Sequence, residues 1–307
     1  MGKRFIACAA AGVLALAAGQ AQAVLIYANT GTQIAQFDSA SPGTLTNAGG
    51  TPTTVSGLNV GETLLGIDVR PVNQDLVGVT STNRLVRINR ATFAILDFLP
   101  LVADSTDTTA PFFTSVSGTN FGVDFNPAAD RLRVVSDTGQ NLRINPFTGA
   151  VSADLPLTTG TTITGAAYDR NAPPPQGGTT LFVINAANGN LARQGDVNGT
   201  PDSPNNGAVT NLGSLGRGAT LDPRIGFDIS GTGAGTAFAS FVEGGVSRLY
   251  TVNTAGTPST ALVGTIGGTG PYLGITQAVA IPEPAGLGLL GVGSLVALRR
   301  RRRVVHV

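Results

Sequence analysis

Two short phrases recur along the chain at intervals of roughly 50 residues. The first is Gly-apolar-Asp-apolar-x-Pro, with full copies at Gly66 and Gly122 and weaker ones at Gly165, Gly226 and Gly274. The second is two polar residues followed by Leu-x-x-x-Asn, and it places Leu85, Leu142, a looser copy at Leu191, and Leu249. These leucines are 57, 49 and 58 residues apart. Such a period predicts one supersecondary unit per repeat, each packed against its neighbours.

Each repeat divides into four short segments of β character, punctuated by Gly, Asn, Asp, Thr and Pro. No window of 12 or more residues keeps a helical period. Strands are expected near 64–69, 75–80, 84–89 and 94–101; 120–125, 131–136, 141–145 and 150–157; 162–168, 180–185, 190–194 and 208–213; and 224–229, 235–242, 247–252 and 259–265. Four-stranded units at this spacing are typical of β-propeller blades.

The two ends of the repeat region complement each other. Residues 272–280 supply only a first strand, whereas the N-terminal part supplies strands near 24–28 and 33–37 and one more within 44–56. A ring that completes its last blade from both ends leaves no open sheet edge. We therefore expect an all-β propeller of five four-stranded blades. A sixth blade would require a unit hidden in 100–120 or 195–222, and an open sandwich or solenoid is the main alternative.

The N-terminus, residues 1–23, has the features of a secretory signal peptide. A basic start precedes an apolar run of 14 residues, and Ala21 and Ala23 form a small-x-small cleavage motif ahead of Val24. A membrane anchor is the alternative, but a spanning helix takes about 20 apolar residues. The expected partner is a signal peptidase, and the mature chain would be exported.

The C-terminus, residues 281–307, resembles the PEP-CTERM sorting tail. Its marks are Pro282, Glu283 and Pro284, an apolar stretch over 285–298, and a basic cluster that includes Arg299, Arg300 and Arg301. The resemblance implies a Gram-negative, exopolysaccharide-producing bacterium and removal of the tail by an exosortase. The protein would be tethered transiently to the inner membrane by the apolar helix and then reach the cell surface or the extracellular space. A simple tail anchor is the alternative.

Composition excludes several kinds of chemistry between these ends. Residues 24–281 contain no Cys, His, Met, Trp or Lys. Disulfides, Cys/His zinc sites, Ser–His or Cys nucleophiles and a catalytic lysine are therefore excluded within that stretch. The same stretch has 12 Arg and 17 Asp or Glu. Because it lacks a basic field, nucleic acid is not an expected partner.

The repeats in 61–71 and 121–127, with the continuation through 130–136 and 140–143, resemble a bacterial domain family of unknown function. Members occur in exported and PEP-CTERM proteins. The resemblance covers most of 24–280, the predicted repeat domain. It implies a propeller-like fold and an extracellular setting, and it implies no activity.

The densest polar cluster lies within 124–145. Arg131 and Arg133 are two apart on one expected strand, so they share a face. Paired guanidiniums can bind carboxylates, sulfated sugars or uronic sugars in bidentate fashion. The candidate ligand-binding residues are Arg70, Asp124, Asn126, Asp130, Arg131, Arg133, Asn141 and Arg143. The alternative is structural, because buried Arg and Asp in a propeller tend to pair with each other or with turn amides.

Asp68, Asp124 and Asp228 occupy one position of the repeat. One interpretation is a shared structural role, such as accepting N–H groups of turns or of the neighbouring blade. The other is a ring of carboxylates in the central channel that binds a cation; no cofactor is predicted, and calcium is the open possibility. Glu62 and Glu243, the only glutamates in 24–281, are expected to be solvated loop residues.

These observations favour a non-enzymatic surface or matrix protein that binds exopolysaccharide or another envelope component. A polysaccharide hydrolase or lyase with an Asp/Arg site in the channel is the alternative. A purely structural propeller is the third hypothesis.

Overall fold

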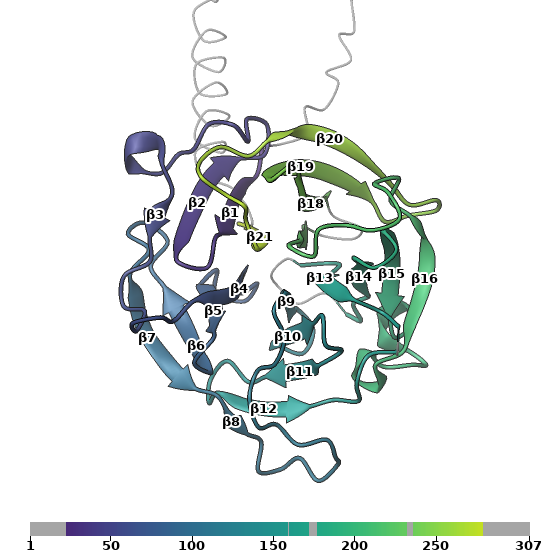
Figure 1. Cartoon of the computed structure of the whole chain (residues 1–307). Helices are drawn as coiled ribbons and strands as arrows, with labels where there is room; N and C mark the ends of the chain where they lie inside the picture. Colours follow the sequence, from purple (N-terminus) through teal and green to yellow (C-terminus); the bar gives the residue numbers. More distant parts are fainter. Residues whose placement is uncertain (1–22, 159, 172–176, 232–235, 279–307) are drawn as a thin grey trace, which may run out of the picture.

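The computed structural model describes residues 23–278, except 159, 172–176 and 232–235. The predicted sorting tail and all but the last residue of the predicted signal peptide lie outside the described residues. Five antiparallel sheets stand around a central channel (Figure 1). The predicted all-β, five-bladed propeller is confirmed, and the described residues form no sixth blade.

Four strands build each blade, counted here from the channel outward. Blade 1 consists of β21 (Gly274–Gln277), β1 (Leu25–Asn29), β2 (Gln33–Asp38) and β3 (Thr53–Thr54). Blade 2 consists of β4 (Leu64–Val69), β5 (Leu76–Thr80), β6 (Arg84–Ile88) and β7 (Ile95–Pro100). Blade 3 consists of β9 (Phe121–Asn126), β10 (Arg131–Ser136), β11 (Asn141–Ile144) and β12 (Ala150–Ala153).

Blade 4 consists of β13 (Ile163–Tyr168), β14 (Leu181–Asn185), β15 (Asn190–Gln194) and β16 (Val209–Ser214). Blade 5 consists of β17 (Gly226–Ser230), β18 (Thr236–Glu243), β19 (Val246–Asn253) and β20 (Ser259–Thr265). The connections contain the 3-10 turns η1 (Ala48–Gly50), η2 (Val197–Gly199) and η3 (Pro204–Asn206). The long connection after blade 2 adds β8 (Val102–Ala103), which pairs in parallel with β12 and makes blade 3 five-stranded.

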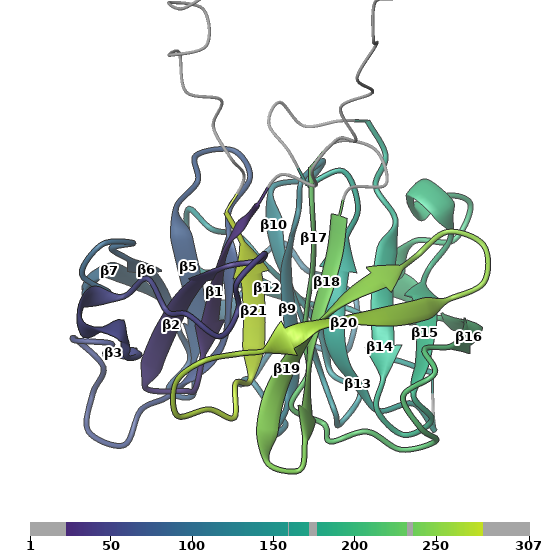
Figure 2. The same cartoon turned by 90° about the horizontal axis from the view of Figure 1, so that it is seen from above.

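The ring closes within blade 1, as the sequence predicts. Strand β21 pairs antiparallel with β1, with Asn29 opposite Gly274 and Ile26 opposite Gln277. The last described strand thus becomes the innermost strand of the blade that the first described strands begin (Figure 2). Both ends of the repeat region are held by one sheet.

Burial falls from the channel to the rim. Every residue of β13 is buried, whereas β20 at the rim is largely exposed. A strand with neighbours on both faces needs apolar or small residues at every position, so the innermost strands lack the usual alternation. This explains why the first segment of each repeat consists mostly of apolar or small residues, apart from the aspartate that recurs in three of the blades.

The repeated glycines mark the places where innermost strands of adjacent blades come closest. A Cβ on Gly66 would lie 2.3 Å from Val123 Cγ2 of blade 3. A Cβ on Gly122 would lie 2.8 Å from the backbone nitrogen of Ala166 in blade 4. On Gly226 it would lie 2.5 Å from the nitrogen of Ile275 in blade 1. No side chain fits at such contacts, so the repeat uses glycine there.

The second phrase describes the third strand and the turn after it. Its leucines, Leu85, Leu142, Leu191 and Leu249, are all buried in the cores between blades. The asparagine that follows, four residues after Leu85 and three after Leu142, shapes the turn to the outermost strand. Asn89 Oδ1 accepts the N–H groups of Ala91 and Thr92, and Asn145 Oδ1 accepts that of Phe147. These are Asx turns, in which a side chain replaces a backbone acceptor.

The expectation that Glu62 is solvated is wrong. Glu62 precedes β4, is buried, and accepts hydrogen bonds from the Asn59 N–H at 2.7 Å, from Thr82 and from the Arg84 guanidinium. Burial opposes its ionisation, but hydrogen bonds from Arg84, Thr80, Thr82 and Asn59 outweigh it and lower the pKa of Glu62 to about 2. Glu243 is half-buried and pairs with Arg217.

Glu62 is expected to make the protein sensitive to acid. Because its pKa is lower in the folded state than the ordinary 4.5, its contribution is complete above pH 4.5 and is lost as the pH falls toward 2. The contribution is on the order of 3 kcal/mol. Urea unfolding at several pH values should show Glu62→Gln less stable at pH 7 and with a smaller slope between pH 4.5 and 2.

Asp97→Asn is the matched control for Glu62→Gln. Asp97 also pairs with an arginine, Arg87, but both side chains are about half exposed, at 56% and 45%. Exposed ion pairs contribute little, so this variant should follow the wild type. An identical pH slope for Glu62→Gln and the wild type would contradict the assignment.

Candidate functional site

A polar pocket of about 300 Å³ opens between blades 3 and 4. Its walls include Arg131 and Arg133 from β10, Arg143 from β11, Tyr168 at the end of β13 and Asn205 from η3. The loop between β15 and β16, which carries η2 and η3, closes the side that blade 4 provides. We call this the arginine pocket.

Strand geometry brings the three arginines together. Arg131 and Arg133 are two residues apart on β10, and Arg133 lies opposite Arg143 in the β10–β11 register. All three therefore project from one face of blade 3. Like charges directly opposite on a sheet are unfavourable, so the pair of Arg133 and Arg143 needs an acceptor between them.

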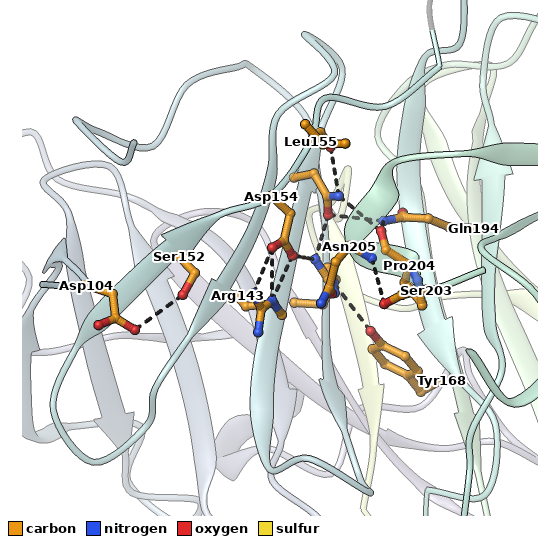
Figure 3. Close-up of polar contacts among 12 residues, drawn as sticks. Asp104, Arg143, Ser152, Asp154, Leu155, Tyr168, Gln194, Ser203, Pro204 and Asn205 are labelled. Carbon is orange, nitrogen blue, oxygen red and sulfur yellow. Dashed lines mark hydrogen bonds and ion pairs between the residues drawn. The ribbon is translucent and has the colours of Figure 1, made fainter. Parts of the chain in front are cut away.

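Asp154 is that acceptor. Its Oδ2 receives a hydrogen bond from Arg133 Nη1 at 2.6 Å and one from Arg143 Nε at 2.8 Å, and its Oδ1 receives one from Arg143 Nη2 at 2.9 Å (Figure 3). Asp154 follows β12, so the acid and both arginines belong to one blade. The single carboxylate neutralises about half of the charge that the two guanidiniums bring.

Arg133 is fully buried, and three of its other four N–H groups bind further protein partners. Nη1 also binds Asn141 Oδ1 at 2.7 Å, Nη2 binds Asn205 Oδ1 at 2.7 Å, and Nε binds the Tyr168 hydroxyl at 3.3 Å (Figure 3). Burial works against its charge, and Tyr168 and Asp154 keep the pKa of Arg133 above its ordinary value. Arg133 thus ties blade 3 to β13 and η3 of blade 4.

Asn141 and Asn126 complete the wall. Asn141 is buried, donates to the carbonyls of Leu155 at 3.0 Å and Pro204 at 3.1 Å, and accepts from Gln194 at 3.0 Å. Asn126 lines the pocket, and its Oδ1 accepts N–H groups of the β9–β10 turn. Both side chains position the backbone around the pocket.

Arg131 differs from its neighbours. It is half-buried, and its one hydrogen bond within the described chain runs from Nη1 to the Asp130 carbonyl at 3.0 Å. It takes part in none of the ion pairs between described residues. The pocket lining has three guanidiniums and, among the described residues, no Asp or Glu. The arrangement presents positive charge to a ligand and suits an anion.

Arg70 and Asp130, also candidates from sequence, lie elsewhere. They form an ion pair with each other, and the Arg70 guanidinium stacks 4.4 Å from the ring centre of Phe147. Arg70 and Phe147 line a second groove, of about 320 Å³, between blades 2 and 3. Arg70 is therefore not a third arginine of the face that Arg131 and Arg133 share.

Asp68, Asp124 and Asp228 converge in the central channel from β4, β9 and β17. All three are buried, and one oxygen of each lies within 4.8 Å of the others. Burial and then repulsion from neighbouring carboxylates raise the pKa of Asp68 and Asp124 well above the ordinary value. Burial raises the pKa of Asp228 to about 6.

Each of these carboxylates also has the inter-blade role expected from sequence. Asp68 Oδ2 accepts the Phe125 N–H of the next blade at 2.7 Å, and Asp124 Oδ2 accepts the Tyr168 N–H at 2.7 Å. Asp228 Oδ2 accepts the N–H of Gln277 in blade 1. Thr276 fills the same position in blade 1 and accepts the Val69 N–H at 3.0 Å. The repeat position thus joins successive innermost strands.

Asp154 and Asn205 were not singled out by the sequence analysis. Asp154 lies within the outer strand expected at 150–157, where an exposed polar residue is ordinary. Asn205 lies 72 residues from Arg133 in the chain, in a loop whose course no periodicity predicts. Nothing in the sequence signals their contact with Arg133, although the two-residue spacing of the arginines signals the face on which they meet.

No helix among the described residues has the length and hydropathy to cross a membrane. A search of curated proteins finds no match. Among solved structures, a protein of unknown function from Bacteroides thetaiotaomicron VPI-5482 is similar with a TM-score of 0.42 and 10% identity, over 70% of this chain. This chain covers 53% of that protein, about half its length.

Two further structures show similar values. PorZ, a surface component of the type-IX secretion system of Porphyromonas gingivalis, has a TM-score of 0.36 and 16% identity, over 76% of this chain and 27% of PorZ. YCF48 bound to a D1 peptide has a TM-score of 0.38 and 12% identity, over 78% of this chain and 81% of that one.

The comparison with protein families is decisive. Residues 33–276 match a family described as a domain of unknown function, DUF4394. The match runs from the second strand of blade 1 through four complete blades to the closing strand β21. The chain therefore belongs to the DUF4394 family, and its propeller is that domain.

Proposed function

We propose that this protein is an exported propeller that binds an acidic polysaccharide through the arginine pocket. The observation that carries the proposal is a pocket lined by three guanidiniums and no carboxylate among its described residues, in which Arg131 has no acidic partner. A uronate carboxylate or a sulfate group matches the fork of a guanidinium. The volume of about 300 Å³ is at the lower end of the range for ligand pockets, about 300–1,000 Å³.

The predicted signal peptide and the predicted sorting tail support an extracellular place of action. The first strand begins at Leu25, directly after the predicted cleavage site, and the last ends at Gln277, ahead of the predicted tail. Processing of both ends by a signal peptidase and an exosortase would leave every strand of the ring in place. Export, transient tethering and delivery to the surface or matrix remain part of the proposal.

A hydrolase or lyase site in the channel has less support. The three channel carboxylates are 0–1% exposed, and a polymer cannot reach them. The arginine pocket offers no pair of carboxylates for glycoside cleavage. Binding without cleavage is therefore the better reading of the accessible groups.

Arg131→Gln is expected to weaken binding to polygalacturonate about tenfold, which corresponds to about 1.4 kcal/mol, without lowering Tm. Glutamine removes the charge and keeps much of the side-chain length. Binding would be followed by co-elution of the protein with the polymer on a sizing column and by calorimetry, and it should weaken with salt because exposed charges are screened. Neutral dextran should not bind.

Arg224→Gln is the matched control, since Arg224 is half-buried, pairs with Asp222 and does not line the arginine pocket. This variant should bind polygalacturonate as the wild type does. Equal affinity for dextran, or unchanged binding by Arg131→Gln, would contradict the proposal. Shortened polymer in the mixture would instead identify an enzyme.

A further inference from the structure

Negative charge in the central channel has no basic partner. Asp68, Asp124 and Asp228 bring three carboxylates into a fully buried place. None of the ion pairs between described residues includes any of them. Buried charges in proteins are paired or bound to metal ions, so this arrangement needs a counter-charge or a change in protonation.

The inter-blade role of these residues uses only part of their bonding capacity. Asp124 Oδ2 and Asp228 Oδ2 accept backbone N–H groups, but Asp124 Oδ1 and Asp228 Oδ1 are buried without a hydrogen-bond partner. Buried carboxylate oxygens without a partner are unfavourable. Both oxygens of Asp68 have hydrogen-bond partners. A purely structural role explains one oxygen of Asp124 and of Asp228 and leaves the other oxygen of each unexplained.

A neutral side chain that is not one of the three aspartates lies beside this cluster. Asn171 follows β13 in blade 4, the blade that has Ala167 where the others have Asp or Thr. Asn171 is 3% exposed, its side chain hydrogen-bonds Asp228, and its Oδ1 has no partner within the described chain. An amide oxygen is a common calcium ligand. Blade 4 thus contributes an unsatisfied oxygen of its own.

The spacing of the carboxylate oxygens suits one central ion. Calcium binds oxygens at about 2.3–2.6 Å, so two ligands on opposite sides of the ion are about 4.8 Å apart. The ligand oxygens of Asp68, Asp124 and Asp228 all lie within 4.8 Å of one another. One ion placed among them can therefore lie within coordinating distance of all three carboxylates.

We propose that the channel binds one calcium ion between Asp68, Asp124 and Asp228, with Asn171 Oδ1 as a neutral ligand. The donor set consists of hard oxygens, which favour calcium over softer metals. The ion would connect blades 2, 3, 4 and 5 at or next to their innermost strands. Its role would be to lock the propeller, independently of what the arginine pocket binds.

The test is thermal unfolding and calorimetric titration of the purified protein, first treated with a chelator and then supplied with calcium chloride. We expect one calcium per chain. We expect a rise in Tm of roughly 5–10 °C at a calcium concentration about 100 times Kd. Absence of heat and of any Tm shift at millimolar calcium, or a larger response to magnesium, would overturn the proposal.

Asp124→Asn tests the calcium site while preserving the hydrogen bond that Asp124 makes within the fold. Asparagine keeps an oxygen to accept the Tyr168 N–H and removes one buried carboxylate. The calcium-free variant should therefore be at least as stable as the calcium-free wild type, but its Tm should not respond to calcium. Asp107→Asn, on the connection after blade 2, should respond as the wild type does. An unchanged Kd for calcium in Asp124→Asn would overturn the assignment.

Discussion

Arg133→Met is expected to lower the stability of the protein by about 3 kcal/mol and its Tm by roughly 6–12 °C. Methionine fills similar space but donates no hydrogen bond. The Asn205 side chain and the Tyr168 hydroxyl lose their hydrogen bonds to Arg133, and Asp154 keeps Arg143 alone. Removing one partner of a buried charged network leaves the others desolvated, which costs more than the network contributes overall. Differential scanning calorimetry measures the effect.

Two companion variants make the result specific. Arg133→Lys keeps the charge, but one ammonium cannot span acceptors on Asp154, Asn141, Asn205 and Tyr168, so an intermediate Tm is expected. Arg87→Met removes an arginine whose side chain is 45% exposed, and its Tm should stay near that of the wild type. A wild-type Tm for Arg133→Met would show that the network does not hold blades 3 and 4 together.

A chain that stops after Pro271 is expected to lose cooperative unfolding. It lacks β21, so the innermost edge of blade 1 is open and the ring is not closed. The buried side chains of Tyr272 and Ile275 are lost with it, and so is the hydrogen bond between Thr276 and Asp68 at 2.7 Å. The combined loss is comparable with the whole stability of a domain, about 5–15 kcal/mol.

The matched truncation stops after Ala280 and removes only the predicted sorting tail. It keeps β21 and should unfold in one transition at the wild-type Tm. Circular dichroism during heating and a sizing column would distinguish a folded ring from an aggregating chain. A single sharp transition for the shorter chain would contradict the closure role of β21.

The course of the backbone could be predicted well, because local rules and the repeat agree. The expected strand at 64–69 is β4 and that at 131–136 is β10, residue for residue. Apolar runs that are buried on both faces, Asx turns and glycine at close approaches each leave a mark in the sequence. Closure of the ring could be predicted because the C-terminal end of the repeat region supplies only one strand of a blade and the N-terminal end supplies the other three.

The site could be predicted only in part. The spacing of Arg131 and Arg133 showed a shared face, because side chains on a strand alternate. The spacing did not show that the Arg133 guanidinium is hydrogen-bonded to Asp154, Asn141, Asn205 and Tyr168. Nor did it show that the Arg131 guanidinium has no acidic partner among the described residues. Glu62 was misjudged for the same reason: its partner Arg84 is 22 residues away, and sequence alone does not indicate which loop glutamate is buried.

The repeat, the strands, the number of blades and the residue types available for chemistry can all be recognised in the sequence alone. These features depend on contacts that every repeat makes in the same way, so the corresponding sequence phrases recur several times along the chain. Which side chains meet between blades follows only from the folded ring. Asn205 with Arg133, and Asn171 with Asp228, are contacts made once, between segments that the ring brings together. Their geometry depends on closure of the ring, and closure has no local signature at these residues.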